Sequence, residues 1–296
     1  MKVLVTGANG FLGYYLVEKL LANDFSVIAT GKGENRLSFN SGNSFIYEQM
    51  DFTESSFVDV LIEKHNPWCI IHAGAISKPD DCELNKDLAY KVNVSGTINL
   101  LKAAERGKRF FIFISTDFIF DGEKGMYTEE DLPGPVNYYG QTKLLAEAEV
   151  MKYEGKWSIV RTVLVYGKPN SGRNNLLTIV KEKLERGEEY NVFDDQVRTP
   201  TYVGDLADGI ISIIKNKATS IFHIAGKDEL TPYEMACKTA VFLGLDKTMI
   251  KKITEKDMKQ IAKRPPKTGF NIEKAKKILS YNPVYFDEGL KLTFNT

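Results

Sequence analysis

The sequence predicts an α/β fold in which helices cover both faces of a doubly wound parallel sheet. The first observation is an alternation, between residues 2 and 161, of short β-branched runs with longer segments of helical periodicity. The second is that strand-like runs such as residues 110–114 are apolar at every position rather than at every second one. Strands have this composition when both faces of a parallel sheet are covered. Together the observations indicate consecutive βαβ units.

The first half of the chain is expected to supply most of the sheet, with helices between the strands. We predict strands at residues 2–6, 26–30, 45–49, 69–73, 109–115 and 157–161. We predict helices at residues 11–22, 55–64, 84–105 and 138–153. Residues 31–43 and 122–136 are rich in Gly, Pro or polar side chains and are expected to be irregular. The second of these segments could flank an active site.

After residue 161 the alternation becomes looser. The sequence predicts helices at residues 176–186, 205–215, 232–243 and 272–279, and a strand-like run at 221–225. We expect a main domain at residues 1–165, to which 201–225 return. Residues 166–200 and 226–296 are expected to form a smaller lobe over the carboxyl ends of the strands, where open α/β sheets bind ligands. A cleft between the two would follow.

Composition excludes several classes of protein. The 296 residues carry 39 Lys+Arg and 39 Asp+Glu, so there is no basic surplus for nucleic acid or acidic membranes. With 43% hydrophobic and 26% charged residues, the chain is expected to fold compactly. Met1-Lys2 runs directly into a strand-like segment, and no stretch of about eighteen apolar residues occurs, so neither export nor membrane spanning is indicated.

The cysteines and histidines predict a chain without a structural metal. The three cysteines form no CxxC pair and the three histidines are scattered. An odd number of cysteines, one of them in an apolar run, fits a reducing compartment, and we expect a cytoplasmic protein.

The first predicted strand-to-helix turn carries glycines in a nucleotide-binding arrangement. Residues 6–13 read TGANGFLG, with Gly7, Gly10 and Gly13 flanking Phe11 and Leu12. Glycines there permit a tight turn and close approach of the backbone to a pyrophosphate, while the helix amino terminus offers free N–H donors. In this context the turn predicts an NAD(P)-binding Rossmann fold.

The end of the second strand favours the phosphorylated cofactor. An NAD site usually has an acidic residue at this point, whereas here Lys32 follows the strand and Arg36 comes shortly after. Either cation could bond a 2′-phosphate, so NADP(H) is favoured without excluding NAD(H). Asp51 and Phe52, just after the third strand, could hold the adenine edge.

The most specific signal is Tyr139-Gly-Gln-Thr-Lys143 on a predicted helix, with Thr116 upstream at the end of an apolar strand. Residues four apart share a helix face, so the Lys143 ammonium can lie beside the Tyr139 hydroxyl and lower its pKa. Tyr139 is then a general acid for a carbonyl oxygen, and Thr116 bonds the same oxygen. The adjacent Tyr138 has Thr142 at the corresponding position and lacks this partner.

With these motifs in place, the chain resembles the extended short-chain dehydrogenases/reductases over essentially its whole length. The motifs are TGANGFLG (6–13), HAGA (72–75), YGQTK (139–143) and RTVLVYG (161–167). Within that superfamily, STDFIFDG (115–122) and RTPTYVGDLA (198–207) resemble the dTDP-4-dehydrorhamnose reductases. The resemblance implies an enzyme in which Thr116, Tyr139 and Lys143 are catalytic.

The resemblance also implies a cofactor and a substrate. NADPH would lie along the glycine turn and the strand ends, with Ala73, Gly74 and Ala75 bordering the nicotinamide. The substrate would be a 4-keto-6-deoxy sugar on dTDP, reduced at C4. Some of these enzymes form magnesium-bridged dimers, which allows a homodimer, but no ligand set maps onto this chain and we assign no metal site.

Three alternatives stay open. Sugar-nucleotide 4,6-dehydratases are similar but carry a basic Glu where this chain has Phe118, and epimerases of this fold typically hold NAD, which fits poorly with Lys32. The regulatory subunit of methionine adenosyltransferase is also similar and binds NADP as a partner protein. It would make this chain a regulator rather than an enzyme.

Substrate contacts are the least defined part of the prediction. We expect the nucleotide sugar to meet polar or aromatic side chains near the strand ends and in the smaller lobe. The candidates are Asp117, Phe118, Tyr166, Asn175 and Arg198. Arg198 could pair with a diphosphate or form an ion pair between the lobes.

Overall fold

The computed structural model describes residues 1–170, 174–258 and 260–295. The remaining residues, 171–173, 259 and 296, fall in the ranges predicted for the smaller lobe and lie outside the described residues. A seven-stranded parallel sheet forms the centre, in the order β10-β6-β5-β4-β1-β2-β3. Its strands are β1 (Lys2–Thr6), β2 (Ser26–Gly31), β3 (Phe45–Gln49), β4 (Cys69–His72), β5 (Phe110–Thr116), β6 (Trp157–Thr162) and β10 (Ile221–His223). The predicted α/β class with a parallel doubly wound sheet is confirmed.

Both faces of the sheet are covered, which explains why its strands are apolar at successive positions. In β5, Phe111 and Phe113 pack into the core on one face, whereas Ile112 packs into the core on the other. All three side chains are fully buried. Because the strand side chains alternate between faces, each central strand contributes to two cores.

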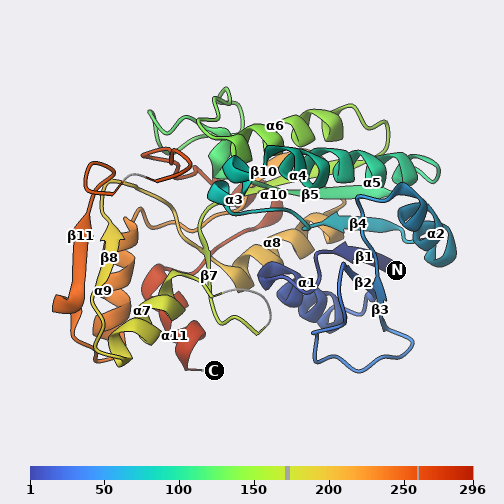
Figure 1. The fold of residues 1–296 in the computed structure, drawn as a ribbon. Coiled ribbons are helices and arrows are strands. Elements are labelled where there is room, and N and C mark those ends of the chain that lie inside the picture. The colour runs from blue at the N-terminus through green and yellow to red at the C-terminus, as the bar shows by residue number, and fades with distance from the viewer. Residues whose placement is uncertain (171–173, 259, 296) are drawn as a thin grey trace.

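Each face has its own group of helices (Figure 1). On one face lie α2 (Ser55–His65), α5 (Gly96–Glu105) and α6 (Tyr138–Met151). On the other lie α1 (Phe11–Ala22), α8 (Val203–Asn216) and α10 (Glu273–Leu279). The helix that packs beside α1 therefore comes from a part of the chain that is distant in sequence, and β10 directly after it enters the sheet beside β6.

The helix predicted at residues 84–105 is divided in the structure. It is replaced by α4 (Lys86–Tyr90), a π-helical turn (Lys91–Ser95) and α5, and α3 (Pro79–Leu84), which was not predicted, comes before them. Asn85 separates α3 from α4, because its side chain accepts a hydrogen bond from the Leu88 amide and caps the second helix. The π-helical turn lies between α4 and α5 and makes the helical path one residue longer there.

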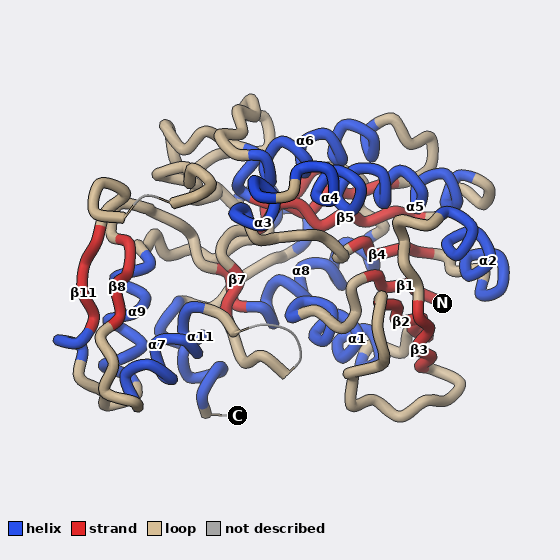
Figure 2. The backbone as a smooth tube through the Cα atoms, viewed as in Figure 1, coloured by secondary structure: helices blue, strands red, loops and turns tan. Residues whose placement is uncertain are grey.

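A second group of elements lies beside the sheet, at the left of Figure 2. Helices α7 (Leu176–Glu185), α9 (Pro232–Phe242) and α11 (Phe286–Phe294) pack there with the parallel pair β8 (Tyr190–Phe193) and β11 (Ile250–Ile253). A short pair, β7 (Val165–Tyr166) and β9 (Thr201–Tyr202), connects this group to the main sheet. Single 3-10 turns occur at Asp117–Ile119 and Lys247–Met249.

Among the described residues, no helix is long and apolar enough to cross a lipid bilayer.

Candidate functional site

The glycine turn lies between β1 and α1. At Gly7 and Gly13 the neighbouring backbone is too close to leave room for a side chain. Gly7 has a φ of +67°, a conformation that favours glycine. A Cβ at Gly7 would lie 2.8 Å from the Gly74 backbone, and one at Gly13 would lie 2.3 Å from the Gly7 carbonyl oxygen. Helix α1 begins at the N-cap Gly10 without a side-chain cap and without an acidic residue in its first turn. The positive end of this helix is therefore not neutralised by its own first turn, which fits the pyrophosphate of a dinucleotide.

The loop after β2 folds back over this turn. The Arg36 amide donates to Asn9 Oδ1 at 3.0 Å, and its guanidinium donates to the Asn9 carbonyl oxygen at 3.3 Å. The Asn9 side-chain Nδ2 donates to the Tyr47 hydroxyl on β3 at 2.7 Å. Asn9 thus connects the glycine turn to the loop that carries both predicted phosphate-binding cations, a role that the glycine pattern did not indicate.

Lys32 and Asp51 lie together at the ends of neighbouring strands. Lys32 Nζ is 2.9 Å from Asp51 Oδ2, and the lysine side chain is 82% exposed. A solvent-exposed pair of this kind contributes little to stability, about 0 to 1 kcal/mol. The lysine is therefore available for exchange to another anion at the same edge of the sheet.

The segment after β4 runs beside the glycine turn. Ala73, Gly74 and Ala75 are partly exposed there, next to the Phe52 ring. A Cβ at Gly74 would lie 2.5 Å from the Phe52 ring, and the same ring excludes a Cβ at Gly96. The structure therefore brings the backbone of Ala73 and Gly74, after β4, against Gly7 in the turn after β1, and packs Phe52, from the end of β3, against Gly74.

His72 ends β4 as a buried polar residue between two hydroxyls. Its Nδ1 lies 2.7 Å from Thr6 Oγ1 and its Nε2 lies 3.1 Å from Thr97 Oγ1. Burial lowers the pKa of His72 to about 3, so the ring is neutral at pH 7. Thr6 also accepts from the Gly74 amide at 3.3 Å, so this cluster fixes the position of the loop after β4.

Thr116, Tyr139 and Lys143 meet at the carboxyl end of β5. Thr116 ends the strand, and the other two lie one turn apart on the buried face of α6. The Tyr139 hydroxyl lies beside Thr116. Lys143 Nζ donates to the Ile114 carbonyl oxygen at 2.7 Å and lies 3.9 Å from the centroid of the Phe113 ring.

Burial controls the charge of both helix residues. It raises the pKa of Tyr139, with the neighbouring Thr116 hydroxyl acting in the opposite direction. It lowers the pKa of Lys143 to about 7, opposed by the Glu147 carboxylate one turn further along α6. The expected lowering of the Tyr139 pKa by Lys143 is not observed, because desolvation of two buried groups outweighs their attraction.

Two of the predicted substrate residues pair with each other. The buried Asp117 carboxylate lies 3.7 Å from Arg198 Nε, and it also accepts a hydrogen bond of 3.1 Å from the Thr116 hydroxyl. The Arg198 guanidinium lies over the Phe118 ring, and that ring meets Tyr139 edge to face at 5.9 Å. Burial raises the pKa of Asp117, although Arg198 acts to lower it. Of the two roles expected for Arg198, this conformation has the ion pair.

The other two predicted substrate residues have structural contacts. Tyr166 is 2% exposed and packs against Phe286 and Tyr202 in the core below α11. Asn175 is the N-cap of α7, where its side chain accepts from the Leu177 amide, and its Nδ2 donates to the Gly167 carbonyl oxygen at 2.7 Å. Neither side chain is brought into contact with Tyr139 by any described interaction.

A segment far along the chain closes over the catalytic candidates. Residues 262–268 belong to the loop between β11 and α10 that runs back toward α3 (Figure 2). Arg264 pairs with Asp80 of α3 at 2.5 and 2.9 Å. The N-cap of α6, Asn137, donates to the Lys263 carbonyl oxygen at 2.8 Å, and Thr268 donates to Asp117. Residues 263–267 read KRPPK, and no sequence motif predicted these contacts.

Asn93 is a second residue near the site that no sequence motif predicted. It lies in the π-helical turn and exchanges two hydrogen bonds with the backbone of Ile76. Its Nδ2 also donates to Thr142 Oγ1, next to Lys143, at 3.0 Å. The sequence feature that could have indicated it is a polar side chain between two apolar ones, Val92 and Val94.

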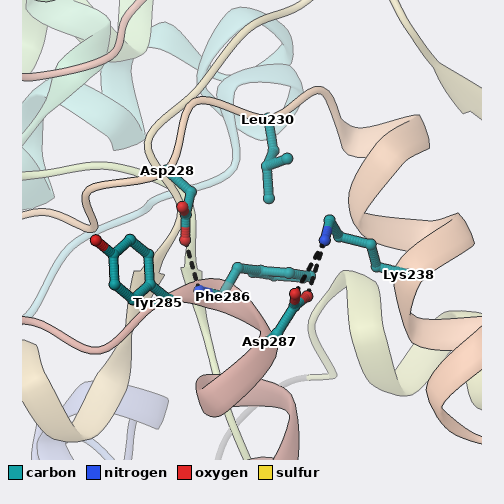
Figure 3. A pocket seen from close by; sticks show the side chains of 6 residues that line it. All are labelled: Asp228, Leu230, Lys238, Tyr285, Phe286 and Asp287. Atoms are coloured by element: carbon teal, nitrogen blue, oxygen red, sulfur yellow. Dashed lines mark hydrogen bonds and ion pairs between the residues drawn. The ribbon is translucent and has the colours of Figure 1, made fainter.

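A separate hollow of about 140 Å³ lies between α9 and α11 (Figure 3). Its polar side chains already have partners: Lys238 pairs with Asp287 at 2.9 Å, and Asp228 accepts from the Phe286 amide at 2.6 Å. Its wall contains no residue of the set at β5. Within the described part of the chain, no three His, Cys, Asp or Glu side chains gather as a metal site.

Comparison with known proteins gives consistent matches. The family model for the RmlD substrate binding domain matches residues 1–296. The rat methionine adenosyltransferase 2 subunit beta is 31% identical over 260 residues, covering 86% of this chain and 75% of the relative. A dTDP-4-dehydrorhamnose reductase from Clostridium acetobutylicum superposes with a TM-score of 0.87 at 30% identity, covering 100% of this chain and 99% of the other. The Bacillus anthracis dTDP-4-dehydrorhamnose reductase, solved in complex with NADP, has a TM-score of 0.85 at 27% identity and coverages of 99% and 98%.

These matches extend over the glycine turn, the strand ends and the helix that carries Tyr139 and Lys143. The resemblance read from the sequence motifs is therefore confirmed, and the chain belongs to the RmlD substrate-binding domain family.

Proposed function

We propose that this protein is an NADPH-dependent reductase of a nucleotide-activated 4-keto-6-deoxy sugar. The observation that carries the proposal is the meeting of Thr116, Tyr139 and Lys143 at the carboxyl end of β5, on the same edge of the parallel sheet as the turn after β1. Membership of the family and the likeness to two dTDP-4-dehydrorhamnose reductases support it.

In the proposed mechanism Tyr139 is the general acid. Its hydroxyl is protonated at pH 7, because burial raises its pKa, and it gives that proton to the carbonyl oxygen of the sugar. Thr116 stabilises the charge that develops on the same oxygen. Lys143 lies on the same face of α6 as Tyr139. Its bond to the Ile114 carbonyl oxygen holds that face against the end of β5. Bound NADPH would supply the hydride that reaches the carbonyl carbon.

The cofactor would be held by the residues predicted for it. The glycine turn and the unneutralised start of α1 fit the pyrophosphate, and the segment from Ala73 to Ala75 fits the nicotinamide side. Lys32 would exchange its Asp51 partner for the 2′-phosphate, with Arg36 beside it. The NADP complex of the Bacillus anthracis relative supports this choice.

We divide the molecule into two functional parts. Residues 1–165 and 201–225 would bind the dinucleotide, since α8 packs on α1 and β10 extends the same sheet. Residues 166–200 and 226–296 would bind the nucleotide sugar, apart from α10, which packs on the main sheet beside α8 and β10. Phe118 is the substrate candidate best placed for the sugar, because its ring touches Tyr139.

A regulatory role is the second candidate. The observation that favours it is the 31% identity to the regulatory subunit of a mammalian methionine adenosyltransferase. The dehydratase alternative is disfavoured by Phe118, whose aromatic side chain cannot remove a proton.

The test is NADPH oxidation, followed optically, with a dTDP-4-keto-6-deoxyhexose generated in situ. Turnover should prefer NADPH to NADH and fall at least about 100-fold in Tyr139→Phe, with the Kd for NADPH nearly unchanged. The control is Tyr138→Phe, which removes the hydroxyl of the adjacent tyrosine and should retain turnover. NADPH binding without turnover on this sugar would favour the regulatory role.

A further inference from the structure

The Asn9 side chain holds the loop after β2 from within the glycine turn. Its Nδ2 donates one proton to the Glu34 carbonyl oxygen at 2.8 Å and the other to the Tyr47 hydroxyl at 2.7 Å. Its Oδ1 accepts from the Arg36 amide at 3.0 Å. Asn9 is buried, with 7% of the residue exposed, so these bonds are shielded from water. Both donors and the acceptor oxygen of this side chain are therefore engaged by the loop and by Tyr47.

Tyr47 reaches the same loop from the edge strand β3. Its hydroxyl has one proton, which it donates to the Gly33 carbonyl oxygen at 2.5 Å, and its oxygen accepts from Asn9. The end of β2 leaves room for this approach, because a Cβ at Gly31 would lie only 2.7 Å from the Tyr47 hydroxyl oxygen. Tyr47 thus connects β3, the loop after β2 and the glycine turn.

Asn9 and Tyr47, called the clasp below, fix the backbone between the two cations predicted for the 2′-phosphate. They bond three backbone groups within residues 33–36. Lys32 directly precedes this segment and Arg36 ends it. The Arg36 guanidinium also donates to the Asn9 carbonyl oxygen at 3.3 Å. The backbone positions of both cations are therefore set before a cofactor binds.

This order matters most for the part of a cofactor that the loop would meet. A 2′-phosphate forms charge-assisted hydrogen bonds with lysine and arginine, whereas the 2′-hydroxyl of NADH brings no charge to them. A loop that is ordered beforehand loses less conformational freedom on binding. Loosening residues 33–36 should therefore weaken the binding of NADPH more than that of NADH.

We propose that Tyr47 is a specificity-determining residue for the cofactor: with Asn9, it holds residues 33–36 so that Lys32 and Arg36 are in place for a 2′-phosphate. The inference rests on the proposed NADPH dependence and deepens it. It adds a residue of β3 to a cofactor site whose predicted phosphate contacts all follow β2. It acts through the loop, because its hydroxyl bonds the loop backbone and Asn9.

The test compares the wild-type protein with Tyr47→Phe, which keeps the ring and removes the hydroxyl. Fluorescence titration gives the Kd for NADPH and for NADH, which differ only in the 2′-phosphate. In Tyr47→Phe the Kd for NADPH should rise about five- to tenfold, because the hydroxyl bonds to both Gly33 and Asn9 are lost. The Kd for NADH should change by less than about twofold, since the loop meets no charge on that cofactor.

The matched control is Tyr153→Phe. The Tyr153 hydroxyl also donates to a backbone carbonyl oxygen, that of Arg109, at 2.6 Å, and it lies at the start of β5, away from the glycine turn. Its removal should leave both dissociation constants unchanged. Melting temperatures of both variants separate a general loss of stability from a change in cofactor preference.

A second measurement tests whether Tyr47 acts through the cations. In a protein that carries Lys32→Ala and Arg36→Ala, adding Tyr47→Phe should raise the Kd for NADPH by less than about twofold, because members of one network are not additive. A tyrosine that only supports the fold would lower the affinity by the same factor in both backgrounds.

The outcomes separate the two proposals. Equal weakening of NADPH and NADH by Tyr47→Phe overturns the specificity role, and so does an unchanged Kd for NADPH. A fully additive effect in the protein without the two cations overturns it as well. The titrations need no sugar, so a protein that binds NADPH as expected but lacks turnover contradicts the reductase and leaves the role of Tyr47 supported. A wild-type protein that binds NADH as tightly as NADPH overturns the role of Tyr47, while turnover with either cofactor still supports the reductase.

Discussion

Lys143 Nζ lies 2.7 Å from the carbonyl oxygen of Ile114, the residue two positions before Thr116 on β5. This bond holds α6 against the end of the strand at the level of the catalytic candidates. It also places the ammonium in a fully buried position, on the face of the Phe113 ring. Burial destabilises the charged form of this lysine and lowers its pKa to about 7.

Replacing Lys143 by Met should stabilise the ligand-free protein below pH 7 while abolishing turnover. The unfolded chain keeps the lysine charged up to its ordinary pKa of 10.5, whereas the folded protein begins to release the proton near pH 7. Between these values the unfolded state binds more protons, so the wild-type protein gains stability as pH rises. The advantage of the Met variant should shrink by roughly 1 kcal/mol per pH unit in this window. Urea unfolding at pH 6.5, 8 and 9.5 measures it.

Lys152→Met is the matched control, because Lys152 follows α6 with its side chain 70% exposed. Its difference from the wild-type protein should not vary with pH in the same way. A Lys143→Met protein that is less stable than wild type at pH 6.5 would mean that the bond to Ile114, about 1 kcal/mol, outweighs the cost of burying the charge.

The sequence predicted the catalytic face but not the contacts that fix it. Spacing of four residues placed Tyr139 and Lys143 on one side of α6, and both are buried there. Spacing cannot show that Lys143 reaches a strand carbonyl, because the bond depends on how α6 packs on β5. The bond between Thr268 and Asp117 joins residues 151 positions apart, and no local pattern encodes such a pairing.

In the fold, too, local sequence patterns predicted the elements that they determine, but not those that depend on distant contacts. Short apolar or β-branched runs predicted every strand of the main sheet. The central strands are buried on both faces, whereas the edge strand β3 is only partly buried. The strand β11 was missed: its two lysines are exposed, and it is a strand only because it pairs with β8, some sixty residues earlier. Helix α11 was missed as well.

Lys32→Ala should weaken binding of NADPH and leave binding of NADH unchanged. The lysine side chain is exposed and held by one partner, Asp51, so its contribution to a 2′-phosphate is that of a screened charge. We expect the Kd for NADPH to rise about three- to tenfold. Fluorescence titration with both cofactors at fixed ionic strength measures the change.

Lys91→Ala serves as the comparison, since Lys91 forms a similar exposed pair with Glu54 at 2.9 Å. It should leave both dissociation constants unchanged. Equal weakening of NADPH and NADH by Lys32→Ala would contradict contact with the 2′-phosphate.

Gly13→Ala should destabilise the protein and abolish dinucleotide binding. Alanine normally favours a helix over glycine by about 1 kcal/mol, so propensity alone predicts a gain. Here, however, the new Cβ would lie 2.3 Å from the Gly7 carbonyl oxygen and 2.6 Å from the Ala8 backbone, and neither can move without opening the turn between β1 and α1. Overpacking of this kind costs about 1 to 3 kcal/mol, which outweighs the propensity term.

Gly33→Ala is the control, because no described atom outside its own chain neighbours lies within 4 Å of its Cβ position. It should leave the free energy of unfolding within about 0.5 kcal/mol of the wild-type value. A Gly13→Ala protein with wild-type stability and NADPH affinity would show that the turn is not the cradle described above.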